Sequence, residues 1–509
     1  MHTTEEATTD RAPAALPRTP GTTRRTDLRG GVYALAMRLH FYAGVFIGPF
    51  LLVASVTGAL YAISPTIESI VSRDLLTVAS NGMPKSLSEQ VDAAVASRPN
   101  LSLVAVAPAA DRDDTTRVLF EDPALEQFER RAVFVDPYTA RPVGDSVVYG
   151  SSGALPLRTW IDRLHRDLHL GEPGRIYSEI AASWLWIVAL VGALLWVRRV
   201  RGRRTRNSWW WLLAADRSRR GRGRTLNWHG AVGMWVLGLA LLLSATGMTW
   251  STYAGANVAA LRQQLNWTTP AVSTELPTAA ARGHDSQSDR REGNHTAPTP
   301  ADPITQLDQV YAVARAEGIA QASEITVPTA PREAFTVKER RVPGSYTVDA
   351  LAVDGETGTV TDRLPYADWP LMAKLANWGI QFHMGLMFGL LNQLVLLAAM
   401  IGLITVIVRG YLLWWRRRPT RGTSGFALGR APRRGALRTI SAPRAVPLLI
   451  VAAAVGWFVP LVGATLLVFL AVDILIGLVG RVRGRRHRSR LGDPRRSEDL
   501  EPVVPRGHE

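Results

Sequence analysis

The chain has 509 residues, 47% of them hydrophobic, and a formal net charge of +16. It contains no cysteine, which excludes disulfides, iron–sulfur clusters, thiolate zinc sites and cysteine nucleophiles. Any metal chemistry must therefore use histidine, carboxylate or methionine ligands. The positive charge does not indicate nucleic-acid binding, because the main arginine clusters abut apolar blocks and none stands apart as a basic patch interleaved with aromatic residues.

The first 30 residues are rich in threonine, proline and arginine, a composition typical of a disordered tail. They lack an apolar core followed by a small-residue cleavage site, so they do not resemble a cleaved signal peptide. We therefore expect 1–30 to be a cytoplasmic tail and the helix that follows, 31–64, to direct insertion into the membrane.

Beyond this tail, hydrophobic residues gather in blocks long enough to cross a lipid bilayer. A hydrocarbon core about 30 Å thick needs about 20 residues of α-helix. We expect four single membrane helices and then a short helical hairpin that turns at Pro460. The expected elements, in chain order, are 31–64, 161–200 with an amphipathic outer extension, 229–252, 371–415 and the hairpin 445–480.

Arginine clusters set the expected orientation of these helices. Residues 198–224 hold eleven arginines and one acidic residue, and residues 409–444 hold ten arginines and no acidic residue. Because short cytoplasmic loops are enriched in lysine and arginine, the loops 201–228 and 416–444 and the tail 481–509 are expected in the cytoplasm. The sequence thus predicts a multi-pass protein of the plasma (inner) membrane, surrounded by the lipid bilayer, with both termini cytoplasmic.

Two longer polar segments, 65–160 and 253–370, are left on the extracytoplasmic side. Within the second, 269–303 is rich in threonine, proline, serine and charge, and we expect it to be a flexible linker. The two segments share an alternating pattern that leads into an aspartate-initiated turn, at 133–140 and at 351–358. Alternation followed by such a turn predicts two strands joined in a hairpin, so each segment is expected to be α+β.

The membrane helices also repeat along the chain. A shift of 189 residues matches His40 with His229 and the dipeptide Thr57-Gly58 with Thr246-Gly247. A shift of 218 residues matches His165 with His383 and the dipeptide Arg198-Arg199 with Arg416-Arg417. Each half of the chain is therefore helix, outer segment, helix, and the repeat predicts a four-helix core.

Four histidines occupy equivalent places in the two halves. His40 and His229 begin outward-going helices near the cytoplasmic face, whereas His165 and His383 lie near the outer face. A lone histidine at a membrane edge is most often an interfacial hydrogen-bonding group, but ionisable residues inside membranes are costly and usually functional. Paired imidazoles can hold the iron of b-type haem, so two haems b are predicted, with these histidines as axial ligands. Zinc fits less well, because no cysteine or carboxylate in the apolar spans completes either set.

Glycine and arginine near these histidines fit a flat macrocycle. Gly44 and Gly233 lie four residues after His40 and His229, on the same helix face, where a porphyrin could lie against the helix. Helix packing through small residues is the alternative explanation for these glycines. Arg38 precedes His40 by two residues and is expected either to pair with a haem propionate or to anchor the helix at the interface. The same two roles are expected of Arg163, Arg166 and Lys374.

The second helix offers two candidate ligands, His165 and His169, four residues apart. The ungapped repeat selects His165 as the partner of His383. Local similarity of His169-Leu170-Gly171 to His383-Met384-Gly385 selects His169 instead. We favour His165 and retain His169 as the alternative.

These motifs resemble the PepSY-associated transmembrane family, which includes bacterial iron-regulated membrane proteins and ferric-siderophore reductases. The resemblance covers about 30 to 480 and rests on Leu39-His40, Leu164-His165-Arg166-Asp167-Leu168, Trp228-His229, Phe382-His383-Met384-Gly385 and the turns at Asp136 and Asp354. The first turn has Ala140 where glycine is usual. The resemblance implies a polytopic α-helical membrane protein with a four-helix haem-binding core, a C-terminal helical hairpin and two α+β PepSY-like extracytoplasmic segments.

The leading functional prediction is a membrane electron conduit, and the resemblance implies that it is a di-haem protein that reduces the iron of a ferric siderophore, or of another iron chelate, on the extracytoplasmic side. The cytoplasmic loops show no dinucleotide fingerprint, so the expected electron donor is quinol or a membrane reductase. The competing prediction is a membrane-anchored PepSY regulatory or binding protein without redox activity, in which the histidine pairs are structural. A reduced-minus-oxidised absorption spectrum distinguishes the two.

Overall fold

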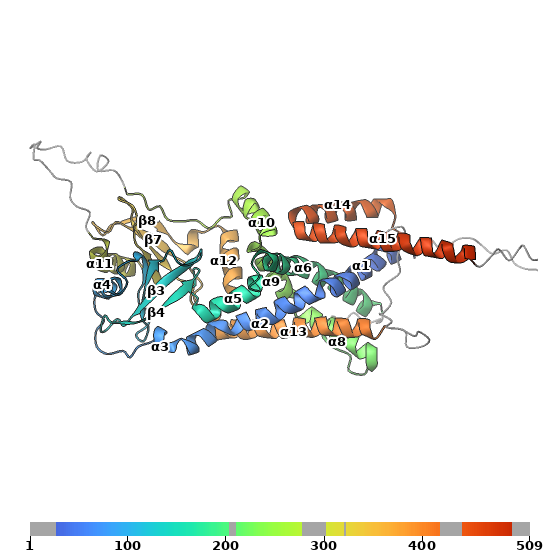
Figure 1. Ribbon diagram of the computed structural model, residues 1–509, viewed down its shortest axis with the longest axis horizontal. Coiled ribbons are helices and arrows are strands. Elements are labelled where there is room, and N and C mark those ends of the chain that lie inside the picture. The colour runs from blue at the N-terminus through green and yellow to red at the C-terminus, as the bar shows by residue number, and fades with distance from the viewer. Residues whose placement is uncertain (1–26, 203–209, 277–301, 320–321, 418–439, 491–509) are drawn as a thin grey trace, which may run out of the picture.

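The computed structural model describes residues 27–202, 210–276, 302–319, 322–417 and 440–490. Most of the expected N-terminal tail and of the linker 269–303, and parts of the three basic segments, lie outside the described residues. An antiparallel sheet with its covering helices forms one end of the molecule, and the long apolar helices form the other end (Figure 1).

Among the described residues, five segments are long and apolar enough to cross a membrane. Four are single helices, and the fifth is the pair α8 and α9, which is bent by 57°. These elements are α2 (Gly48–Val71), α6 (Glu172–Arg201), α8 (Gly221–Trp235), α9 (Leu237–Thr249), α13 (Gly389–Trp415) and the part Pro460–Val479 of α15 (Pro460–Arg490). This is the architecture of a multi-pass membrane protein.

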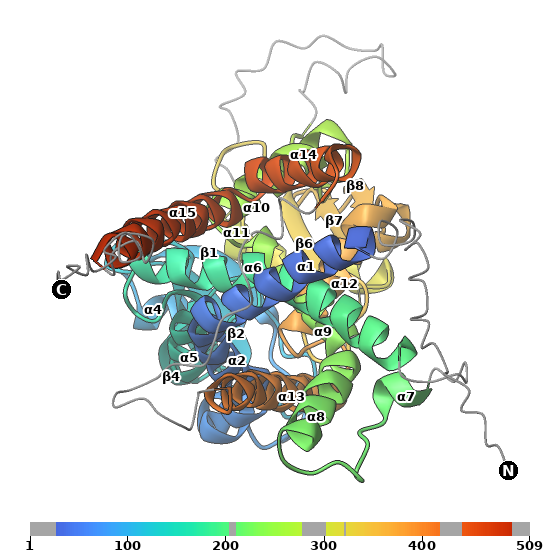
Figure 2. The same ribbon diagram turned by 90° about the vertical axis from the view of Figure 1, so that its right-hand side faces the viewer.

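Two further helices accompany these spans. α1 (Asp27–Phe46) runs into α2 after a break at Ile47, so the helical segment expected at 31–64 extends from 27 to 71. α14 (Ala442–Phe458) is a shorter apolar helix of 17 residues that packs against α15. Figure 2 shows α14 and α15 together on one side of the bundle, opposite α8 and α13.

Like 31–64, which breaks at Ile47, and 229–252, which is the bent pair α8 and α9, the other two expected single helices are each divided in the structure. The segment 161–200 consists of α5 (Pro156–Asp167) and α6, and the segment 371–415 consists of α12 (Leu371–His383) and α13. The backbone is left-handed at both breaks, with φ of +56° at Leu168 and +75° at Gly385, and a right-handed helix cannot continue through such a residue. α5 and α12 therefore lie between the sheet and the long helices (Figure 1).

The long helices pack through small and apolar side chains. α2 packs on α13, α6 on α9, and α8 on α13. Ala43, Ala181 and Ala240 are buried in this core together with Trp184 and Leu403. Because lipid tails are as apolar as these side chains, close van der Waals packing through small residues holds such helices together more than hydrophobic burial does.

The two polar segments form one sheet rather than two. Its eight antiparallel strands have the order β4-β3-β2-β1-β5-β6-β7-β8. The halves join where Ala105 of β1 pairs with Thr326 of β5 and Val106 pairs with Ile325, which covers two strand edges that separate segments would expose. The strands are β1 (Ser102–Ala107), β2 (Thr116–Glu121), β3 (Glu129–Val135), β4 (Pro142–Tyr149), β5 (Ser323–Thr326), β6 (Phe335–Glu339), β7 (Ala350–Val353) and β8 (Val360–Leu364).

One helix from each segment packs on this sheet, α4 (Leu87–Ser97) from the first and α11 (Pro303–Ala316) from the second. Val91 of α4 and Leu307 of α11 are fully buried in one core with Phe120 of β2. The halves therefore share a hydrophobic core as well as a sheet. The remaining short elements are α3 (Arg73–Leu76), α7 (Trp210–Leu213), α10 (Tyr253–Gln264) and the 3₁₀ turn η2 (Tyr366–Asp368).

The two aspartate-initiated turns have the same form, as the repeat predicted. The carboxylates of Asp136 and Asp354 each accept a hydrogen bond from the N–H two residues on, at 2.8 and 3.0 Å. Gly358 has φ of +69° in the second turn, and Ala140 has φ of +53° at the equivalent place in the first. A left-handed alanine costs about 1–2 kcal/mol relative to glycine, so the first turn is the strained copy.

Candidate functional site

The four equivalent histidines meet in two pairs. His40 of α1 and His229 of α8 have ring centroids 6.2 Å apart, and we name them the sheet-distal pair. His165 of α5 and His383 of α12 have ring centroids 6.5 Å apart, and we name them the sheet-proximal pair. The structure thus brings together the partners that the repeat selected. His169 lies elsewhere, exposed in the break after α5, with its ring 5.0 Å from that of Trp160.

The sheet-distal histidines are each oriented by a main-chain carbonyl. His40 Nδ1 lies 3.1 Å from the carbonyl oxygen of Val188 in α6, and His229 Nδ1 lies 2.9 Å from that of Val406 in α13. These two valines are themselves 218 residues apart, the shift that relates α6 to α13. A carbonyl oxygen can only accept, so each Nδ1 carries the proton.

The sheet-proximal histidines are oriented by threonine hydroxyls instead. His165 Nδ1 lies 2.9 Å from Thr57 Oγ1, and His383 Nδ1 lies 2.6 Å from Thr246 Oγ1. Both hydroxyls donate their own protons to carbonyl oxygens one turn back in their helices, at 2.9 and 2.8 Å. The threonine oxygens therefore accept from the histidines, and Nδ1 again carries the proton. All four rings consequently leave Nε2 as the nitrogen available to a metal.

Glycines make room for these rings. A Cβ placed on Gly192 would lie 2.7 Å from Cε1 of His40, and one placed on Gly58 would lie 3.2 Å from Cε1 of His165. Gly410 and Gly247 face His229 and His383 in the same way, at 3.6 and 3.8 Å. By contrast, Gly44 and Gly233 face open space, with nothing within 4 Å of an added Cβ.

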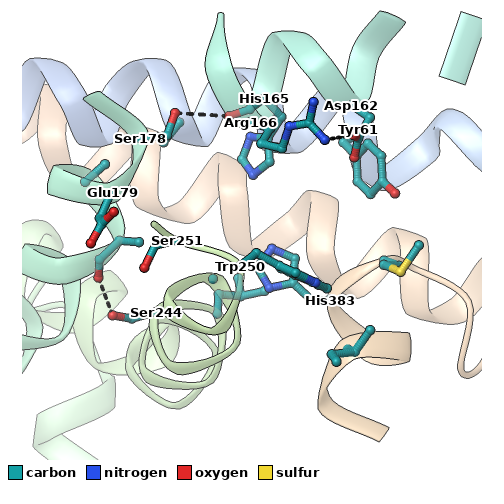
Figure 3. Close-up of a pocket in the computed structure, with 18 of the residues that line it drawn as sticks. Tyr61, Asp162, His165, Arg166, Ser178, Glu179, Ser244, Trp250, Ser251 and His383 are labelled. Carbon is teal, nitrogen blue, oxygen red and sulfur yellow. Dashed lines mark hydrogen bonds and ion pairs between the residues drawn. The ribbon is translucent and has the colours of Figure 1, made fainter. Parts of the chain in front are cut away.

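A cavity of about 500 Å³ surrounds the sheet-proximal pair, a volume within the usual range of ligand sites. Figure 3 shows His165 and His383 on opposite walls, with Tyr61 near the first and Trp250 near the second. The other lining residues include equivalent positions of the two halves, namely Ser55 with Ser244 and Gly58 with Gly247.

Three arginines line this cavity: Arg166, Arg175 and Arg341. Arg166 is already paired with Asp167 at 3.2 Å and Asp162 at 3.8 Å. The Arg341 guanidinium instead donates to the uncharged oxygens of Asn377 and Ser151, both at 3.1 Å. Burial lowers the pKa of Arg341, as expected for a cation held away from water without a carboxylate beside it.

Arg175 and Arg341 were missed by the sequence reasoning. Arg175 follows the break in helical structure at 168–171, and Arg341 lies in the loop after β6, far from His383 in the chain, so neither stands in a motif. The arginines and lysine that were proposed have other partners. Arg163 pairs with Glu126 and Glu129, Lys374 Nζ donates to the carbonyl oxygen of Ala367, and Arg38 pairs with Asp473 of α15.

The donor sets fit iron already held by a porphyrin. A metal bound by two imidazole nitrogens at about 2 Å each, the usual metal–imidazole distance, requires ring centroids about 6 Å apart, as both pairs have. No group of three or more histidine, cysteine, aspartate or glutamate side chains forms a metal site among the described residues. A bare ion would thus find two protein ligands at either pair, whereas a porphyrin supplies the other four itself.

Residues 37–417 match the family described as the PepSY-associated TM region, which confirms the resemblance inferred from the motifs. A search of curated proteins gave no match. The family match spans most of the 509 residues and contains both histidine pairs, the sheet and four of the five apolar spans. The chain therefore belongs to the PepSY-associated transmembrane family.

Proposed function

We propose that this protein carries electrons across the plasma (inner) membrane through two b haems and reduces the iron of a ferric siderophore on the extracytoplasmic side. The observation that carries this proposal is the common arrangement of the two histidine pairs. Four histidines from four helices share one tautomer, and each pair has the spacing that two imidazoles would need to hold one iron between them.

The contacts of the residues indicate which haem each of them would hold. His40 and His229 would hold one haem, and Gly44 and Gly233 leave open space on the same helices for its ring. His165 and His383 would hold the other, within the cavity. Arg175 and Arg341 lie where they would pair with its propionates, because among the described residues neither forms an ion pair with a carboxylate, unlike Arg166. When bound, haem b supplies a one-electron Fe(III)/Fe(II) couple at each pair.

The arginine distribution supports the orientation in the membrane that an outward transfer of electrons requires. The basic ends of α6 and α13 lie at the sheet-distal end of the bundle (Figure 1), and the positive-inside rule places such ends in the cytoplasm. The sheet and the proximal pair would then lie outside. His40 and Gly58 are 18 residues apart, about 27 Å of helix at 1.5 Å per residue, and Gly58 packs on His165. The two pairs thus serve opposite faces of the membrane.

The protein groups at the outer site bind and orient rather than transfer protons. One electron passed to a chelated Fe(III) gives Fe(II), which hard oxygen ligands hold less tightly, so release needs no acid or base. Arg117 and Arg340 add positive charge beside the loop 150–153 at the cavity wall, with guanidinium nitrogens 3.3 and 3.4 Å from a Cβ placed on Gly153. Burial, and then the neighbouring Arg340, lower the pKa of Arg117 to about 9. The carboxylates of Glu68 and Asp114 act on the Arg117 guanidinium in the opposite direction, so the charge beside this loop is mixed.

The test begins with the purified protein in detergent. We expect a Soret band, an α band that sharpens on reduction, and two haems per chain. Adding a ferric siderophore to the reduced protein should reoxidise both haems and deliver ferrous iron to a coloured chelator. His383→Ala should keep a reducible haem at the distal pair but reoxidise slowly. Haem that no ferric chelate reoxidises would contradict the reductase, and protein without haem would favour the membrane-anchored regulatory function.

A further inference from the structure

The two histidine pairs differ in the groups that accept their Nδ1–H hydrogen bonds. At the sheet-distal pair the acceptors are carbonyl oxygens within α6 and α13, and a helix carbonyl already accepts the N–H four residues on. At the sheet-proximal pair the acceptors are the side chains of Thr57 and Thr246. Each distal acceptor therefore also accepts a hydrogen bond of its own helix, whereas each proximal acceptor is a side-chain oxygen that accepts no helix N–H.

The threonine oxygens are also polarised. Each hydroxyl donates to a helix carbonyl at 2.9 or 2.8 Å, and donating a proton strengthens the same oxygen as an acceptor. The shortest of the four bonds is proximal and the longest is distal, while the other two are equally long. The proximal hydrogen bonds are 2.9 and 2.6 Å long, whereas the distal ones are 3.1 and 2.9 Å long.

We propose that Thr57 and Thr246 are positioning residues that lower the reduction potential of the haem at the sheet-proximal pair, an inference that rests on the proposed function. A hydrogen bond from Nδ1–H makes an imidazole more basic and a stronger donor through Nε2. Stronger donation stabilises Fe(III) more than Fe(II), so the potential falls. The adjacent Gly58 and Gly247 leave the space through which the rings reach these hydroxyls. This explains why the Thr-Gly dipeptide occurs at the same place in both halves.

A lower potential at this position matters because of the acceptor. A ligand that binds Fe(III) tightly lowers the potential of the iron that it holds, so reduction requires a strong reductant at the last step. The proximal pair is the one next to the sheet, on the side from which a chelate would approach. The threonines would thus make the terminal haem a better reductant without changing its axial ligands.

The test is a redox titration of wild-type protein and the variants Thr57→Val and Thr246→Val, read by the α-band absorbance. Valine keeps the side-chain shape and removes the acceptor. We expect the reduction potential of one spectral component to rise in both variants. The expected change of about tenfold in its reduction equilibrium constant corresponds to a rise of about 59 mV for a one-electron couple. The shifted component should be the one that His383→Ala lacks, and the other component should stay in place.

Matched variants separate this role from a general effect on the helices. Thr405→Val removes a hydroxyl that donates to the carbonyl oxygen of Gly402 in α13, and it should leave both potentials unchanged. Thr57→Ser keeps the hydroxyl and should retain the wild-type potential. If Thr57→Val loses the proximal haem, the serine variant decides the outcome. Proximal haem that is retained in Thr57→Ser supports the role of the hydrogen bond, and proximal haem that is lost from both variants contradicts it. Wild-type protein without haem would refute the proposed function. Two haems with unshifted potentials in both valine variants would refute this inference alone.

Discussion

Each of the four histidines is oriented at one ring nitrogen and left open at the other. The orienting atom is a carbonyl oxygen for His40 and His229 and a hydroxyl oxygen for His165 and His383. Such contacts fix the tautomer and the ring plane of each imidazole. His169 has a different environment, because it is exposed and its ring lies against Trp160.

Single alanine substitutions of the histidines should therefore remove haem pair by pair. His40→Ala and His229→Ala should lose the same spectral component, and His165→Ala and His383→Ala should lose the other, leaving one haem of two. The exposed His169→Ala variant serves as the control and should keep both. Haem-to-protein ratios and reduced-minus-oxidised spectra measure this outcome. A loss in His169→Ala that matches His383→Ala would show that the wrong ligand was chosen.

The cavity arginines lead to a second prediction at this scale. Arg175→Gln and Arg341→Gln should each weaken haem retention at the proximal pair by about tenfold or more, because a charge-assisted hydrogen bond contributes about 1.5–3 kcal/mol. Arg163→Gln is the matched control, since Glu126 and Glu129 already engage that guanidinium outside the cavity. The rate of haem transfer to an excess of a haem-scavenging protein measures retention. Equal rates of haem transfer in all three variants would contradict the assignment of Arg175 and Arg341 as partners of the haem propionates.

At the scale of the helix, the breaks and the glycines place the histidines. The left-handed residues Leu168 and Gly385 end α5 and α12 near His165 and His383, and hydrogen bonds secure the carbonyl oxygens at these ends. Ser178 Oγ donates to the carbonyl oxygen of His165, at 3.3 Å. Asn392 Nδ2 likewise donates to the carbonyl oxygen of Phe382, at 2.9 Å, so α5 and α12 are both anchored to the spans that follow them.

Two glycines at equivalent places in α6 and α13 should differ in their tolerance of alanine. A Cβ on Gly192 would lie 2.7 Å from the ring of His40, closer than real contacts allow, whereas one on Gly410 would lie 3.6 Å from the ring of His229. Gly192→Ala should displace His40 and lose the distal haem, and Gly410→Ala should keep it. Alanine favours a helix over glycine by about 1 kcal/mol, so a weaker helix would not explain the loss. Full haem content in Gly192→Ala would contradict this packing.

At the scale of the whole molecule, the shared sheet requires both polar segments on one side of the membrane. β1 pairs with β5 across the halves, and Asp308 of α11 accepts a hydrogen bond from the N–H of Leu87 in α4, at 2.6 Å. The sheet, the hydrophobic core and this hydrogen bond all join the two halves of the chain. An even number of spans must therefore separate the two segments, as α6 and the bent pair α8 and α9 do.

Reporter fusions test this topology directly. Fusions that end at Asp113 or Asp308 should report export, because both lie in the sheet domain, and a fusion at Ser218 should report the cytoplasm, because it lies within the arginine-rich loop. Alkaline phosphatase and a cytoplasmic fluorescent reporter give opposite signals at each point and control for expression. Cytoplasmic signal at Asp113 would reverse the assignment of both faces and, with it, the direction of electron transfer.

The sequence by itself determined the features that depend on local pattern. Apolar length predicted the spans, and the motifs around His40, His165, His229 and His383 indicated the family that the match over 37–417 confirms. Periodicity and repetition are properties of the chain, so no contact had to be known to detect them. The repeat also selected histidine partners that the structure places together, because equivalent residues of a two-fold repeat tend to face each other.

Only the tertiary structure decided which distant residues meet. The pairing of Val106 with Ile325 made one sheet from two predicted segments, and the cavity gathered Arg175 and Arg341 beside the proximal histidines. The acceptors of the histidine protons likewise come from helices more than 100 residues away. Such contacts depend on how helices and strands pack in three dimensions, and a hydroxyl or a guanidinium has the same appearance in the sequence whether it faces a cofactor, an acid or lipid.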